Sequence, residues 1–164
     1  MSMISHPFEP LYDENSKILI LGSFPSVISR KDNFYYANKN NRFWKVISNI
    51  FNSPFPESII EKKKLLFDNQ IALWDVIASC EINKSYDSSI RNVIPNDIAK
   101  IVTESKIVKI GCNGDKAFQL YNKYILDKTN IKAIKLPSTS SANASYRIEK
   151  LTRIYREFIK GENE

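Results

Sequence analysis

The sequence of 164 residues contains few of the side chains on which metal and covalent chemistry depend. It has two cysteines, Cys80 and Cys112, and one histidine, His6. Two thiols are too few for a disulfide framework or an iron–sulfur cluster, and a single imidazole gives zinc little help. His6 has no partner nearby in the sequence, so no Ser/His/Asp or Cys/His catalytic set can be built. We therefore expect no bound metal and no nucleophilic triad.

Phosphate-binding glycine motifs and long apolar runs are missing as well. No GxxxxGK[ST] loop exists and no GxGxxG follows the first predicted strand, which disfavours an NTPase or a nucleotide-dependent oxidoreductase. No apolar run is long enough to cross a bilayer, and the N-terminus lacks a signal-peptide pattern. We therefore expect one domain over residues 1–164 that is cytoplasmic, monomeric and not attached to a membrane.

The chain is basic, and the charge is uneven along it. The formal net charge is +6 and the pI is about 9.2. Residues 1–80 carry an excess of one positive charge, and residues 81–164 carry an excess of five. A basic surface favours a polyanionic partner such as nucleic acid. A lysine-rich protein without such a partner is the alternative, and charge alone does not decide between them.

Short apolar runs alternate with helical patterns. Four β-branched runs predict buried strands at Lys17–Ser23, Gln70–Ile77, Lys106–Cys112 and Ile131–Leu136. Apolar stripes and start signals predict helices at Arg42–Phe51, Glu57–Asp68, Asp97–Thr103, Asp115–Leu126 and Tyr146–Ile159. This alternation predicts an α/β fold whose parallel sheet is covered on both faces. Ligands of such sheets sit outside the carboxyl ends of the strands.

The segment after the first predicted strand is rich in aromatic residues. Gly22-Ser23-Phe24-Pro25-Ser26 is followed by a polar loop that contains Phe34-Tyr35-Tyr36, and a helix opens at Asn41. Three adjacent aromatic side chains are costly to leave in water. A flat ligand such as a nucleobase, stacked on one ring, would explain them. The alternative is that these rings plug the edge of the sheet.

The other strands also end in polar residues. The last strand leads into small hydroxyl residues that could donate to a phosphate or could only cap the final helix, namely Ser138, Thr139, Ser140 and Ser141. Asn113 follows the third strand, although Asn-Gly is also a common turn pair. Asp75 near the end of the second strand adds one carboxylate, which could also be a simple cap.

Three segments resemble the signature motifs of the hypoxanthine-DNA glycosylases, a branch of the uracil-DNA glycosylase superfamily: Gly22–Ser26, Phe34–Trp44 and Leu136–Ala144. Asn41–Ile47 is also similar to the matching segment of the mismatch-specific uracil glycosylases. The resemblance runs from about His6 to Tyr155. It implies a three-layer α/β/α fold around a four-stranded parallel sheet, no cofactor, and excision of a base that is flipped out of DNA.

The resemblance also implies a catalytic residue. The usual acid or amide of the superfamily lies one residue before the first-motif proline, and Phe24 at that position cannot orient water. In the hypoxanthine branch the amide comes from the start of the following helix, which maps onto Asn41, with neighbouring Asn40 as the alternative register. Asn41 would hold water against C1′ of the sugar without a covalent intermediate.

The remaining site residues follow as hypotheses. We expect Tyr36 to stack on the base, Phe34 or Tyr35 to line the pocket beside Phe24, and Asn113 and Asp75 to bind the polar edge of the base. We expect DNA contacts from the two motifs and the basic residues near the second one: Ser23, Ser26, Pro137, Ser138, Thr139, Ser140, Ser141, Asn143, Lys135, Arg147 and Lys150.

The expected partner is double-stranded DNA that contains a deaminated base, most simply hypoxanthine, with single-stranded DNA as an alternative substrate. A uracil or G·U/T mismatch glycosylase on the same fold is the nearest competing interpretation. A non-catalytic α/β module that binds nucleic acid or a phosphorylated ligand is the competing interpretation from another class, and Phe24 at the usual catalytic position keeps it open.

Overall fold

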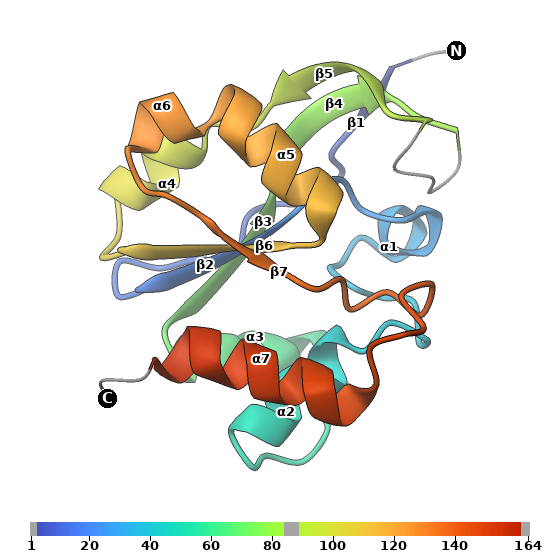
Figure 1. The fold of residues 1–164 in the computed structure, drawn as a ribbon, viewed down its shortest axis with the longest axis vertical. Coiled ribbons are helices and arrows are strands. Elements are labelled where there is room, and N and C mark those ends of the chain that lie inside the picture. The colour runs from blue at the N-terminus through green and yellow to red at the C-terminus, as the bar shows by residue number, and fades with distance from the viewer. Residues whose placement is uncertain (1–2, 84–88, 162–164) are drawn as a thin grey trace.

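The centre of the molecule is a four-stranded parallel sheet, seen in a computed structural model that describes residues 3–83 and 89–161 (Figure 1). Its strand order is β3-β2-β6-β7, with bounds Ile71–Asp75, Ile18–Gly22, Lys109–Asn113 and Ile134–Leu136. The neighbouring strands pair in parallel, as the sequence predicted. Each strand falls inside a predicted apolar run, except that β6 ends one residue beyond its run.

Helices cover both faces of this sheet, which confirms the expected three-layer α/β/α arrangement (Figure 1). The helices on one face are α2 (Phe43–Ile50), α3 (Ile59–Asp68) and α7 (Ile148–Lys160). Those on the other face are α4 (Ile98–Thr103), α5 (Asp115–Tyr124) and α6 (Leu126–Thr129). The predicted helix Asp115–Leu126 therefore ends early, because a break at Ile125 separates α5 from α6.

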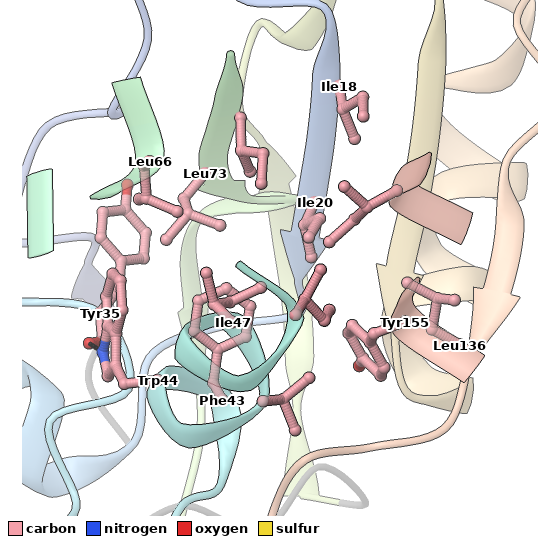
Figure 2. Close-up of a cluster of buried hydrophobic side chains, with 14 of the residues drawn as sticks. Ile18, Ile20, Tyr35, Phe43, Trp44, Ile47, Leu66, Leu73, Leu136 and Tyr155 are labelled. Atoms are coloured by element: carbon pink, nitrogen blue, oxygen red, sulfur yellow. Dashed lines mark hydrogen bonds between the residues drawn. The ribbon is translucent and has the colours of Figure 1, made fainter. Parts of the chain in front are cut away.

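Successive residues of β2 point to opposite faces and so build two cores. Ile18 and Ile20 pack with the residues of α2 and α7, whereas Leu19 and Leu21 pack with those of α4 and α5. Figure 2 shows the first cluster, in which Ile18 and Ile20 lie among side chains from several elements, including Phe43, Ile47 and Tyr155. Because β2 is buried along its whole length, it fixes the centre of the sheet.

The structure contains a second sheet that the sequence did not predict. It is antiparallel, has the order β1-β4-β5, and comprises Ile4–Ser5, Ile77–Glu81 and Arg91–Pro95. The predicted strand Gln70–Ile77 is therefore divided at Val76. Asn96 holds this break, since its Nδ2 donates to the carbonyl oxygens of Asp75 at 2.8 Å and Ile77 at 3.1 Å.

A short helix, α1 (Val27–Asp32), was also not predicted and lies at the end of β2. Ser26 caps it, because its Oγ accepts from Ser29 N at 3.1 Å. Ser29 in turn accepts from the backbone N–H of Ala37 at 3.1 Å. The helix therefore ties the first motif to the aromatic loop that follows it.

Candidate functional site

A cleft of about 240 Å³ opens at the carboxyl ends of the parallel strands. It contains most of the predicted site residues: Ser23, Phe24, Ser26, Tyr36, Asn41, Asp75, Asn113, Ser138, Thr139, Ser140 and Ser141. A larger cavity of about 450 Å³ lies at the opposite edge of the sheet, beside Lys17 and Lys109, and holds none of these residues. The smaller cleft is therefore the candidate site.

Six predicted residues lie outside the lining of this cleft. Phe34 is only 6% exposed and stacks on Trp44 in the core with ring centroids 6.0 Å apart, so the expectation that it lines the pocket is wrong. Tyr35, the alternative to it, does line the cleft. The roles of the other five as DNA contacts stay predictions: Lys135, Pro137, Asn143, Arg147 and Lys150.

Asn41 lies in the cleft with its carbonyl oxygen already bonded. Oδ1 accepts from Phe43 N at 2.9 Å and from Thr139 Oγ1 at 2.8 Å. Because Phe43 N can only donate, these contacts fix which end of the amide is oxygen. The amide N–H groups are then the part that can serve a ligand. Neighbouring Asn40 is exposed and does not line the cleft.

A hydrogen-bond network joins Asn41 to Asn113 through Thr139. Asn113 Oδ1 accepts from Thr139 N at 3.0 Å, and Asn113 Nδ2 donates to Thr139 Oγ1 at 3.0 Å. Thr139 is completely buried, so its hydroxyl needs partners and finds them on both sides. The Asn113 amide also lies beside the hydroxyl of Tyr36. The network places the amides from β6 and from the start of α2 around one cleft.

Arg42 holds the loop of the second motif, and sequence reasoning missed it. Its guanidinium donates to the carbonyl oxygens of Thr139 at 3.2 Å, Ser140 at 2.6 Å and Asn143 at 3.2 Å, and also to that of Tyr146. Only the planar fork of arginine offers so many donors in fixed directions. No local sequence signal could reveal it, since its partners lie about 100 residues away along the chain.

Tyr36 presents an unusual backbone and a buried hydroxyl. Its φ of 52° lies in the left-handed region, and Phe43 covers one face of its ring with centroids 4.2 Å apart. A base could therefore stack only on the other face. Burial raises the pKa of Tyr36, the Asp75 carboxylate raises it further, and the Asn113 amide opposes them. The phenol is thus a neutral donor, and it has no hydrogen-bond partner among the described residues.

His6 and Asp75 form a buried pair that the sequence did not predict. His6 Nε2 lies 2.7 Å from Asp75 Oδ2, each side chain is 5% exposed, and His6 Nδ1 lies 2.8 Å from the carbonyl oxygen of Phe8. His6 has no partner nearby in the sequence, but the fold gives it one in space. Asp75 is 69 residues away along the chain, and the short strand β1 brings His6 to it.

Phe24, at the position usually catalytic in the family that the motifs resemble, lies at the side of the cleft. Its ring is half-buried and meets the ring of His6 edge-on at 6.1 Å, and the guanidinium of Arg30 lies 5.4 Å from its centroid. Arg30 also donates to the carbonyl oxygen of Pro25 at 2.8 Å. Phe24 is thus held as an apolar wall and carries no group that could activate water.

Within residues 3–83 and 89–161, no three or more histidine, cysteine or acidic side chains are grouped so as to hold a metal ion. In the same ranges, no helix combines the length and the apolar character needed to cross a membrane.

Comparison with known proteins gives consistent matches along the chain. Residues 9–159 match the model of the uracil DNA glycosylase superfamily. A hypoxanthine DNA glycosylase of Methanosarcina acetivorans is 34% identical over 146 residues, which are 88% of this chain and 91% of that protein. One of Methanosarcina barkeri is 36% identical over 87 residues, covering 52% of this chain and 54% of that protein. An NMR structure of a candidate uracil DNA glycosylase from Methanosarcina acetivorans superposes with a TM-score of 0.78 at 32% identity, over 96% of this chain and 99% of that one.

Proposed function

The chain belongs to the uracil DNA glycosylase superfamily, and from that membership and its cleft we propose that it excises a deaminated base, hypoxanthine first, from DNA. The single observation that carries the proposal is the convergence of Asn41, Asp75, Asn113 and the hydroxyl of Tyr36 on one cleft at the ends of the parallel strands. A concave site with a small number of convergent polar groups can bind a ligand whose edge has a defined pattern of hydrogen-bond donors and acceptors.

The base enters this cleft only after it leaves the duplex. Unpairing costs a few kcal/mol and costs less for a damaged pair, which provides part of the selectivity. The face of Tyr36 that points away from Phe43 supports the flipped base, and the amide of Asn113 and the carboxylate of Asp75 bind its polar edge. We propose double-stranded DNA as the substrate and a monomer as the active form.

Asn41 then positions the attacking water. Because its carbonyl oxygen is committed to Phe43 and Thr139, the amide acts as a donor: one N–H binds one lone pair of the water. The other lone pair faces C1′ as the glycosidic bond breaks. The electrons of that bond leave with the base, and the proton lost by water balances the charge on the released base. An oxocarbenium-like transition state requires an oriented water more than a strong base.

The test is a panel of duplexes that carry hypoxanthine, uracil or xanthine, each assayed for alkali-labile sites. Preferred cleavage at hypoxanthine supports the proposal, whereas preferred cleavage at uracil would assign the chain to the competing uracil activity. Absence of cleavage on every duplex, with DNA binding intact, would leave only a non-catalytic binding module.

A further inference from the structure

The proposed reaction uses Asp75, which lines the base cleft, but does not use the buried partner of Asp75, His6. We propose that His6 is a positioning residue that determines base specificity: it holds Asp75 so that Oδ1 is always a hydrogen-bond acceptor, and the cleft therefore selects bases with a ring N–H beside a carbonyl. The inference rests on the proposed function and adds to it a reason for preferring deaminated bases.

The first step is the position of protons on His6. The carbonyl oxygen of Phe8 can only accept, so Nδ1 carries a hydrogen and donates to it at 2.8 Å. Two lone pairs would repel each other across the 2.7 Å between Nε2 and Asp75 Oδ2, so one proton lies between these atoms. Whether histidine or the acid carries that proton, Asp75 uses Oδ2 for His6. Oδ1 is then left without a hydrogen.

Aromatic rings surround the His6 imidazole, so few other groups can bind the proton that lies between His6 and Asp75. Rings of Phe8, Phe24 and Tyr35 surround the imidazole at centroid distances of 4.6, 6.1 and 6.1 Å. The Tyr35 hydroxyl is committed to the carbonyl oxygen of Glu9 at 2.8 Å. Among the described residues, Asp75 is the charged side chain in contact with His6, while Arg30 lies over the ring of Phe24.

The second step is the place of Oδ1. A Cβ added at Gly22 would lie 2.4 Å from Asp75 Oδ1 and 3.4 Å from Tyr36 Oη, so both oxygens lie over this glycine at the end of β2. Tyr36 Oη is buried without a hydrogen-bond partner among the described residues, and the Asn113 amide lies beside it. The cleft thus places one fixed acceptor near the hydroxyl of Tyr36 and the amide of Asn113.

The third step is the match with bases. Hypoxanthine presents N1–H next to O6, and uracil presents N3–H next to O4, so each offers a donor to Asp75 and an acceptor to Asn113 or Tyr36. Adenine presents the reverse pattern, with N1 as an acceptor and N6 as a donor. A ligand that leaves the buried polar groups of a pocket unpaired is rejected strongly. An apolar pocket discriminates between similar ligands far less. Guanine shares the lactam edge, so this pair selects against adenine and not against guanine.

Loss of His6 would change the chemistry of this edge. Asp75 is 4% exposed and would stand without its partner, and a buried lone carboxylate takes up a proton. Its Oδ1 could then become a donor. The protonated Asp75 would then place a donor opposite the N1–H donor of hypoxanthine. A base whose ring nitrogen accepts a hydrogen bond would bind the pocket better than before.

The experiment compares single-turnover excision from duplexes containing hypoxanthine and unsubstituted purine, whose N1 accepts and which lacks O6. His6→Ala is expected to lower the rate for hypoxanthine by about tenfold to a hundredfold while affecting purine much less, so that the preference between the two narrows by about tenfold or more. A merely structural role would lower both rates together. An unchanged preference in folded His6→Ala protein would overturn the inference.

Asp75→Asn gives an independent arm in case His6→Ala fails to fold. The amide can donate Nδ2–H to His6 Nε2 and keep its oxygen toward the base, so the variant should excise more slowly but retain the preference for hypoxanthine. Loss of the preference in folded Asp75→Asn protein would contradict the proposed orientation.

The matched control is Asp68→Asn, which breaks the exposed ion pair with Lys64 at 2.8 Å and should change neither the rate nor the preference. The wild-type protein distinguishes failure of this inference from failure of the proposed function. If it excises hypoxanthine but folded His6→Ala protein keeps its preference, or folded Asp75→Asn protein loses it, the inference fails and the proposed function stands. If it excises no base, the proposed function itself fails.

Discussion

At the scale of single residues, the amide of Asn41 differs from a general base. Its carbonyl oxygen binds Phe43 N and Thr139 Oγ1, so it offers only N–H groups to the cleft. This arrangement suits a reaction that needs water held in place rather than deprotonated early. It also distinguishes Asn41 from Asn40, which is exposed and outside the cleft.

We expect Asn41→Ala to lower single-turnover excision by about a hundredfold or more, because one well-placed polar group is worth roughly 3 kcal/mol of transition-state stabilisation. Duplex binding should stay nearly intact. Asn40→Ala is the matched control and should excise at the wild-type rate. Equal rates for wild type and Asn41→Ala would remove Asn41 from the chemistry, and a large loss in Asn40→Ala would indicate the other register.

At the scale of elements, the parts that followed from sequence are those with continuous apolar patterns. The run Ile18–Gly22 is buried throughout, and it predicted both the central strand and the sheet edge where the cleft forms. The sheet of β4 and β5 escaped prediction because Ile77–Glu81 has little apolar periodicity and Arg91–Pro95 ends in proline. The local apolar pattern of the strands therefore predicted the edge of the sheet where the cleft lies.

Contacts distant in sequence limited the prediction of the site. The polar residues at the strand ends could be found because all parallel strands end at one edge. Arg42 and His6 could not be found, since each acts through partners 69 or more residues away. Phe34 was misplaced because sequence cannot show which of three adjacent rings faces inward, and the structure buries it against Trp44.

The connection between α2 and the second-motif loop gives a prediction at this scale. Arg42→Lys replaces a planar fork by one ammonium group, which cannot reach the carbonyl oxygens of Thr139, Ser140, Asn143 and Tyr146 together. We expect a loss of roughly 1–3 kcal/mol in the free energy of unfolding, because buried acceptors lose their partners, and slower excision because Asn41 depends on Thr139. Urea unfolding and single-turnover assays measure both.

Arg156→Lys is the appropriate comparison, because Arg156 is exposed on α7 and the change keeps the same charge. It should match wild type in both assays. If Arg42→Lys also matched wild type, the four carbonyl contacts would contribute little to the loop, and another feature would have to hold it.

At the scale of the whole molecule, the basic charge belongs mostly to the second half of the chain, which includes the second-motif loop and α7. Lys135, Arg147 and Lys150 are exposed near that loop or at the start of α7. DNA binding that relies on such side chains releases counterions and so weakens with salt. We expect the electrostatic contribution to come from this side rather than from α3, because the second-motif loop lines the cleft. Lys64 on α3 lies 2.8 Å from Asp68, and Lys135 lies 3.7 Å from Asp115.

Three phosphate contacts from Lys135, Arg147 and Lys150 would lower duplex affinity about fortyfold between roughly 50 and 200 mM salt. Arg147→Ala and Lys150→Ala should each weaken binding on every DNA sequence and reduce the slope of log Kd against log salt by about one. Lys64→Ala removes the same charge from α3 and should leave the slope unchanged. Fluorescence anisotropy with a labelled duplex across the salt series measures all four proteins. A slope that is flat in the wild type, or equally reduced by all three substitutions, would mean that the DNA does not lie across the start of α7.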